Sequence, residues 1–210
     1  MGIVIQLSDV RLSFPKLDVP DYFKSVKQRP NDKKRWSAAF HIGPQSLAQR
    51  VEGGKLVGVK GNAKAAIDEA LKDVAKTTWE KKWELKLSNI LPDPKGCCWQ
   101  DGARKEMPGV WVLSSHRPED KGRPLVMDTD KSPIYKPDNS LYEGKAGRIY
   151  SGMYVNAQVE VWGQGEPEGL RCTLLIIQRL RDGDAFSGGA APIAETMAEV
   201  SEGADAEDLS

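Results

Sequence analysis

The sequence has few of the residues that build metal centres and disulfide frameworks. Its 210 residues include only three cysteines and two histidines. Cys97 and Cys98 are adjacent and Cys172 is distant, so the cysteines form neither a CxxC metal pair nor a disulfide framework. His41 and His116 give little support to a zinc site or a nucleophilic triad. We therefore expect reduced cysteines in the core or at its edge, and neither a metal nor another cofactor.

Long apolar segments and phosphate-binding loops are missing too. No apolar run approaches the length of a membrane span, and the N-terminal segment lacks the features of a secretory signal. The glycines of Gly53–Gly61 precede a helical pattern without a GK[ST] ending, and Gly163–Gly169 does not fit a dinucleotide fingerprint. We expect a soluble cytoplasmic protein that does not bind a membrane.

Basic residues are absent from the C-terminal segment Ser187–Ser210. It carries only acidic charges, among many Gly, Ala and Ser residues. Such a segment cannot bury enough apolar surface to offset its ordering entropy. We therefore expect one domain at residues 1–186 and a disordered acidic tail at residues 187–210. The acidic residues of this tail are Glu195, Glu199, Glu202, Asp205, Glu207 and Asp208.

The tail hides the charge of the body. The whole chain has 30 Lys and Arg and 30 Asp and Glu, for a formal net charge of zero. Removing the six acidic residues of the tail leaves 24 acidic against 30 basic residues, so the body carries about +6. A basic body with an acidic tail suggests a polyanionic partner, with the tail able to occupy the same surface. Alternatively, the tail only keeps the protein soluble.

Residue patterns predict strands around one helix. Ile3–Phe14 is strand-like, with an irregularity at Ser8-Asp9 and an end at Pro15, and Arg35–Ile42 alternates as a half-buried strand. Asn62 is a candidate N-cap, followed by a helical stripe that breaks or passes into a second short helix near residues 76–78. Trp79 and Trp83, beyond that break, are expected to pack on the sheet.

Further strand-like pieces follow at residues 97–102, 109–118 and 123–128. The two longest candidates, residues 148–162 and 170–180, are joined by a hairpin loop. Several strands around one helix, with long loops, favour a mainly β protein built as a small closed or partly closed antiparallel barrel.

One predicted strand has two contrasting faces. Met153, Val155, Ala157, Val159 and Val161 form an apolar face. The opposite face carries aromatic and amide side chains and follows Arg148, a composition typical of surfaces that stack bases and hold phosphates. An ordinary amphipathic strand whose aromatics pack under a loop is the alternative. The residues of this opposite face are Tyr150, Tyr154, Asn156, Gln158 and Trp162.

Basic and aromatic residues also gather in several loops and strand ends. Their mixture suggests phosphate contacts by the cations and base stacking by the aromatics. For Trp111, packing in the core is the more common alternative. The candidate DNA-binding residues are Lys33, Lys34, Arg35, Trp99, Arg104, Lys105, Trp111, Arg117, Lys121, Arg123, Tyr135, Lys136, Arg148, Tyr150, Tyr154 and Trp162.

Two other functions compete with nucleic-acid binding. Asp138, Glu143 and Lys145 are the residue types of a metal-dependent nuclease, but they lie in one loop rather than on two adjacent strands. The other competitor is a protein-interaction module that never touches nucleic acid.

Five segments, taken in order, resemble a family of phage single-stranded DNA-binding proteins once catalogued as a domain of unknown function and similar to the replication proteins of podophages. The resemblance implies a five-stranded Greek-key OB barrel with one packed helix, a basic groove for single-stranded DNA, and no enzymatic activity. The segments are Val10–Leu17, Arg35–Ile42, Gly109–Asp128, Ile149–Trp162 and Leu175–Gly189.

The resemblance also implies a role for the tail. It would compete with DNA and contact phage or host replication proteins, namely a polymerase, helicase or recombinase. Related tails often finish on a phenylalanine that enters a partner pocket, whereas this chain finishes Asp208-Leu209-Ser210. Competition with DNA is unaffected by this difference, but docking in such a pocket is not expected. The protein is expected to be a monomer or a dimer.

Overall fold

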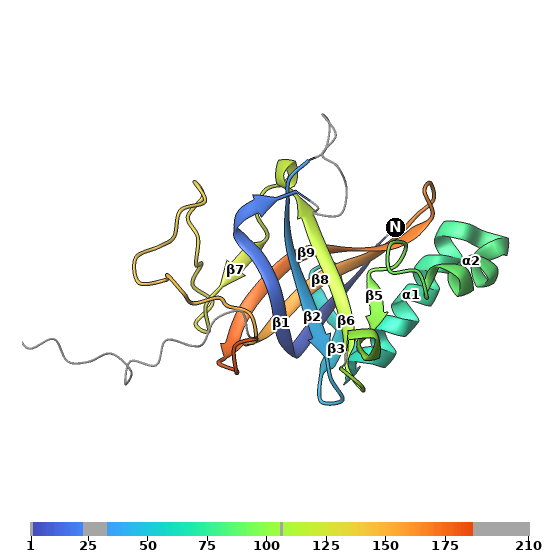
Figure 1. The fold of residues 1–210 in the computed structure, drawn as a ribbon, viewed down its shortest axis with the longest axis horizontal. Coiled ribbons are helices and arrows are strands. Elements are labelled where there is room, and N and C mark those ends of the chain that lie inside the picture. The colour runs from blue at the N-terminus through green and yellow to red at the C-terminus, as the bar shows by residue number, and fades with distance from the viewer. Residues whose placement is uncertain (1, 23–32, 106, 187–210) are drawn as a thin grey trace, which may run out of the picture.

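Five strands form a closed barrel. The structure, a computed structural model, describes residues 2–22, 33–105 and 107–186, without the side chains of residues 104 and 105. The barrel strands, shown in Figure 1, are β1 (Ile3–Asp21), β2 (Arg35–Ile42), β6 (Trp111–Pro118), β8 (Tyr154–Gln164) and β9 (Gly169–Arg181). Their spatial order is β1-β2-β6-β9-β8, and it closes because β8 also pairs with β1. Among the pairs that these five strands form, only β6–β9 is parallel. This arrangement is an OB fold, and it confirms the mainly β prediction.

A long, bent first strand makes the closure possible. The first half of β1 pairs with β8, and its second half pairs with β2. A register shift between Leu7 and Val10 contains Asp9, whose φ is 57°. This bulge confirms the predicted irregularity. The predicted end at Pro15 is wrong, because Pro15 lies inside a second register shift, where no ladder hydrogen bond is required from it.

Four further strands decorate the barrel. β5 (Trp99–Asp101) pairs with β6, and β7 (Leu125–Met127) pairs with β9. β3 (Leu47–Glu52) and β4 (Lys55–Asn62) form a hairpin beside β1. The sequence did not predict this hairpin, because β4 is almost fully exposed and lacks an apolar alternation.

Helices pack against the barrel from one side. Asn62 caps α1 (Ala63–Trp79) as predicted, since its Oδ1 accepts a hydrogen bond from the backbone N–H of Ala65 at 3.1 Å. The helix ends at Trp79, slightly later than predicted, and its C-cap is Glu80, whose φ is 46°. A 3-10 turn, η1 (Glu80–Lys82), then leads into α2 (Trp83–Ile90). No helix among the described residues is long and apolar enough to span a membrane.

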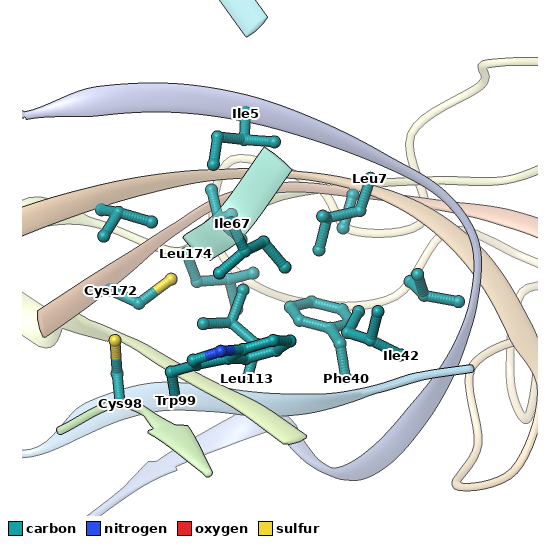
Figure 2. Packing of buried hydrophobic residues seen from close by; sticks show 14 of the residues in the cluster. Ile5, Leu7, Phe40, Ile42, Ile67, Cys98, Trp99, Leu113, Cys172 and Leu174 are labelled. Atoms are coloured by element: carbon teal, nitrogen blue, oxygen red, sulfur yellow. The ribbon is translucent and has the colours of Figure 1, made fainter. Parts of the chain in front are cut away.

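The core lies between the barrel strands and α1. Figure 2 shows Ile5, Leu7, Phe40 and Leu113 converging on Ile67 of α1. Each such buried side chain stabilises the fold by about 1.5–3 kcal/mol relative to exposure. The predicted apolar face of β8, including the preceding Met153, is buried, although the strand itself begins at Tyr154 rather than at residue 148. Trp79 is also buried and Trp83 packs against the core, as expected.

The three cysteines are free and buried, as the sequence analysis predicted. The proposed tail, residues 187–210 with its acidic residues, lies outside the described residues, so its predicted disorder stays a prediction.

Candidate nucleic-acid interface

The outward face of β2 and β6 is mostly half-buried and carries mainly small or basic side chains. Along β2, Trp36 and Phe40 are buried, whereas Arg35 and His41 point outward. Ser37 pairs with His116 of β6, and Ala39 pairs with Ser114. These are the second and third barrel strands, whose outward face binds oligonucleotides in OB folds.

A cavity of about 340 Å³ opens at one end of this face. We call it the basic groove. The β8–β9 hairpin forms its second wall, and the loop after α2 forms its third. In Figure 1 the tip of this hairpin lies beside α2. An ion pair between Lys86 Nζ and Glu168 Oε1, at 2.5 Å, joins the two elements. The groove is lined by Arg35, Pro94, Lys95, Cys97, Cys98, Ser114, His116, Trp162, Gln164, Arg171 and Cys172.

Arg171 is fixed at the centre of the basic groove. Its Nε donates to Gln164 Oε1 at 3.0 Å, and its Nη1 donates to the carbonyl oxygens of Lys95 and Gly96 at 2.9 and 3.1 Å. These contacts hold the guanidinium against neutral oxygen atoms rather than against a carboxylate. Its positive charge is therefore held in position for an external anion.

Positive charges in the groove repel one another. Burial lowers the pKa of Arg35, and the Arg171 guanidinium lowers it further. Burial also lowers the pKa of His116 to about 4, with additional contributions from Arg35 and Arg171. His116 is therefore neutral at pH 7. A polyanion in the groove would relieve the repulsion between the two arginines.

Trp162 supplies an aromatic wall beside these charges. It pairs with Arg171 across the β8–β9 hairpin, and its Nε1 donates to Thr173 Oγ1 at 3.0 Å. The side chain is half-buried, so one part is fixed by packing while another part faces the groove. A fixed ring next to a guanidinium suits base stacking alongside a phosphate contact.

A second cavity, of about 600 Å³, lies at the start of β2 on its other face. We call it the aromatic cavity. It brings together three predicted residues, Arg123, Tyr135 and Lys136, with Trp36 and Tyr142, which were not predicted as DNA contacts.

A third cluster lies on the outward side of β1 and β8. The Arg11 guanidinium lies 4.3 Å from the ring centre of Phe186, and that ring lies 4.8 Å from the ring of His41. Tyr154 lies under Arg181, 3.4 Å from its guanidinium carbon. The segment before the predicted tail is therefore held on the same outward face of β2 that leads to the basic groove.

Several other predicted residues are engaged within the fold. Tyr150 exchanges hydrogen bonds with Gly183 and also donates to Asp182. Arg148 lies 3.9 Å from the buried carboxylate of Asp128, which also pairs with Lys145 at 2.7 Å. These contacts hold the long loop after β7 onto the barrel.

The predicted loop cations lie around the start of β2. Lys33 pairs with Asp120 at 2.5 Å, and Lys34 lies over Tyr22. Arg117 donates to the carbonyl oxygens of Lys121 and Gly122, and the Lys121 side chain is exposed. The side chains of Arg104 and Lys105 lie outside the described part of the structure.

Trp99 does not fit the predicted role of a stacking platform. Only 1% of its surface is exposed, its Nε1 donates to Asp68 Oδ1 at 2.9 Å, and it stacks on Trp111 at 5.0 Å. One face of the Trp111 ring packs on Trp99, and the Lys64 ammonium lies 4.4 Å from the Trp111 ring centre. Trp99 is therefore a core residue, whereas Trp111 is half-buried and packs against the core, so its predicted role in DNA binding stays a prediction.

The carboxylates of the nuclease alternative do not form a site. Asp138 lies in an exposed turn, where its Oδ1 accepts hydrogen bonds from the backbone N–H and hydroxyl of Ser140. Asp138 and Glu143 both lie in the loop after β7 rather than on adjacent strands. Within the described ranges, no group of three or more His, Cys, Asp or Glu side chains could hold a metal ion.

Of the eleven residues that line the groove, the sequence analysis predicted only Arg35 and Trp162 as DNA contacts, and it missed Lys95, His116 and Arg171 among others. The signal for Arg171 was present: it follows the hairpin loop and faces outward opposite Trp162. Lys95 and His116 come from separate segments that only the folded barrel brings together.

Comparison with known proteins gives a match over nearly the whole chain. A family model described as Enterobacter phage Enc34, ssDNA-binding protein, matches residues 3–209. A curated relative, putative protein p50 of Acyrthosiphon pisum secondary endosymbiont phage 1, is 32% identical over 199 residues, covering 94% of each protein.

Two solved structures share the fold. The single-stranded DNA-binding protein of bacteriophage Enc34, in complex with ssDNA, has a TM-score of 0.59 and 20% identity, over 88% of this chain and 89% of that one. The single-stranded DNA-binding protein gp2.5 of bacteriophage T7 has a TM-score of 0.50 and 11% identity, over 98% and 100%.

Proposed function

Because the chain belongs to the family described as Enterobacter phage Enc34, ssDNA-binding protein, we propose that it coats and protects single-stranded DNA during phage replication and recombination. The protein acts without enzymatic activity, in the cytoplasm of the host bacterium. The basic groove supports this proposal most strongly, because Arg35, Arg171 and Trp162 place two cations and one aromatic ring along a single cavity.

In this proposal the DNA backbone follows the outward face of β2 and β6 into the basic groove. Arg35, Lys95 and Arg171 contact phosphates, and Trp162 stacks on a base. The other predicted cations and tyrosines that remain exposed extend the path beyond the groove. Every nucleotide offers a phosphate to contact and a base face to stack on, so sequence preference is weak.

The acidic tail competes with DNA for this surface and contacts replication proteins. Phe186, the last described residue before the tail, packs on His41 at the far end of the outward face from Arg35. Six residues of strand span roughly 20 Å, whereas the proposed tail can extend to roughly 80 Å. The tail is therefore long enough to reach the basic groove.

A fluorescence titration with labelled oligo-dT at several salt concentrations tests the DNA proposal. We expect tight binding that weakens with salt, with a log–log slope of about −0.7 for each phosphate neutralised. Lys95→Ala should reduce the slope by about 0.7, because one phosphate contact is lost. Lys55→Ala is the matched control, since Lys55 is an exposed lysine of β4 that does not line the groove.

If neither the full chain nor a version ending at Phe186 bound oligo-dT at low salt, the interaction-module alternative would replace the DNA proposal. Magnesium-dependent cleavage of the oligonucleotide that disappears in Asp138→Ala would instead support a nuclease.

A further inference from the structure

The start of β2 stands between two cavities. Arg35 and Trp36 are consecutive residues, so their side chains leave opposite faces of the strand. Arg35 lines the basic groove, and Trp36 lines the aromatic cavity. At this point the backbone of β2 separates the two cavities.

The floor of the aromatic cavity is fixed before any ligand binds. The Arg123 guanidinium lies between two rings, 4.5 Å from the ring centre of Trp36 and 3.7 Å from that of Tyr135. Asp18 anchors both layers: its backbone carbonyl accepts a hydrogen bond from Arg123 Nη2 at 2.9 Å, and its carboxylate accepts one from the Tyr135 hydroxyl at 2.6 Å. This prebuilt stack of flat groups needs little ordering when a further flat group joins it.

The rim of the cavity provides a second aromatic surface. Tyr142 lines the cavity with 39% of its surface exposed, and the Lys136 ammonium lies 5.8 Å from its ring centre. Tyr142 is held from behind by a backbone hydrogen bond, from its N–H to the carbonyl of Ile134 at 3.0 Å. An exposed ring on a fixed backbone is available for stacking.

The charges of the wall favour a neutral ligand with hydrogen-bond acceptors. Arg123 and Lys136 are balanced by Asp18 and Glu119, so the cavity offers a phosphate no net attraction. Among the described residues, Arg123 Nε and Nη1 and Trp36 Nε1 have no hydrogen-bond partner. Carbonyl or ring-nitrogen acceptors, which nucleobases carry, are the groups that would satisfy such donors.

We propose that the aromatic cavity receives one unpaired base of the same DNA strand whose backbone lies in the basic groove. The proposal rests on the proposed function, because it requires single-stranded DNA at Arg35. It adds a base-binding pocket to the path and makes the bound strand turn around the start of β2. Duplex DNA cannot use this pocket, because its bases are paired and stacked.

The test measures affinity for a ladder of oligo-dT lengths with the full chain and three single variants. Tyr142→Ala removes the exposed ring, and Tyr142→Phe keeps it. Leu141→Ala is the matched control, because Leu141 is the neighbouring residue, is 38% exposed and does not line the cavity. Circular dichroism and thermal unfolding check that each variant is folded.

We expect Tyr142→Ala to bind the shortest oligonucleotides like the unaltered chain and to bind longer ones about 5- to 20-fold more weakly, because one stacked base is lost. Tyr142→Phe and Leu141→Ala should follow the unaltered chain at every length. In parallel, an oligonucleotide carrying 5-iodouracil at one position at a time should cross-link to the peptides containing Tyr135 or Tyr142 from one position.

Equal affinity of Tyr142→Ala at every length, together with no cross-link in the cavity, would overturn the base-pocket proposal while leaving the proposed function intact. A proline-rich or aromatic peptide that binds the cavity without affecting DNA affinity would also overturn it. No binding of any oligonucleotide by the unaltered chain, with or without its tail, would remove both proposals together.

Discussion

At the scale of single residues, a change at Trp162 tests the contribution of base stacking in the basic groove without changing the charge. Its ring lines the groove beside Arg171 but carries no charge of its own. Trp162→Ala should weaken oligo-dT binding by about 1–3 kcal/mol, while the salt slope stays the same because no phosphate contact is lost. Titrations at four salt concentrations measure both quantities.

Trp162→Phe is the control for this prediction, because it keeps an aromatic ring, although a smaller one, and loses the hydrogen bond to Thr173. It should retain most of the affinity. A large change in the salt slope of Trp162→Ala would show that the tryptophan positions cations rather than stacking on a base.

We expect His116 to make DNA binding depend on pH. In the free protein its pKa is lowered to about 4 by burial and by Arg35 and Arg171. DNA phosphates in the groove would raise this pKa, so binding takes up a proton and should strengthen as the pH falls from 7 towards 5. His116→Gln should remove this part of the pH dependence, and titrations at constant ionic strength measure it.

The same residue affects stability with the opposite sign. An unfolded histidine titrates near pH 6.5, above the folded pKa of about 4, so the unfolded state binds more protons between pH 6.5 and 4. Stability contributed by neutral His116 is therefore present above pH 6.5 and is lost as the pH falls towards 4. If the DNA affinities of the unaltered chain and of His116→Gln both stayed constant from pH 7 to 5, this would contradict the prediction that DNA phosphates lie beside His116.

At the scale of elements, the start of α1 can be tested without touching either cavity. Asn62 Oδ1 caps the helix through the backbone N–H of Ala65. Asn62→Ala should lower the free energy of unfolding by about 1 kcal/mol, whereas Asn62→Asp should keep most of it. Urea unfolding measures the difference. Oligo-dT affinity should be unchanged, and a loss of affinity would show that α1 positions the groove.

Elements with a regular apolar pattern were predictable from the sequence. The alternation through Trp36 and Phe40 identified β2 together with its outward face, and Asn62 identified the start of α1. The β3–β4 hairpin was missed because β4 is exposed on both faces, with 92% of Val59 accessible, so no alternation marks it. Strand prediction depends on burial of one face, and β4 has none.

The candidate site was less predictable, because its residues come from four separate segments. Arg35 was found from its local charge and Trp162 from a strand face, but Lys95 and His116 join them only in the folded barrel. Trp99 was misassigned for a related reason: a tryptophan in a three-residue strand has no neighbouring pattern to show whether it faces the core. Local sequence gives a side chain's direction along a strand but does not show what covers it.

At the scale of the whole molecule, charge is divided between a basic body and the acidic tail. The described part of the chain ends at Phe186, on the outward face that leads to the basic groove. In the proposed competition, attachment of the tail at Phe186 gives its six acidic side chains a high effective concentration at this face. Competition of this kind is electrostatic, so it weakens as salt screens both partners.

A chain ending at Phe186 should bind oligo-dT at least about 10-fold more tightly than the full chain at low salt, because DNA no longer has to displace the tail. The difference should shrink as salt rises. A full-length variant with the six tail carboxylates replaced by Asn and Gln isolates charge from length, and it should behave like the truncated chain. If this neutral tail inhibited DNA binding as strongly as the acidic one, the tail would act by steric exclusion of DNA rather than by electrostatic competition. Equal affinities for all three chains at low salt would instead leave the tail free for partner proteins alone.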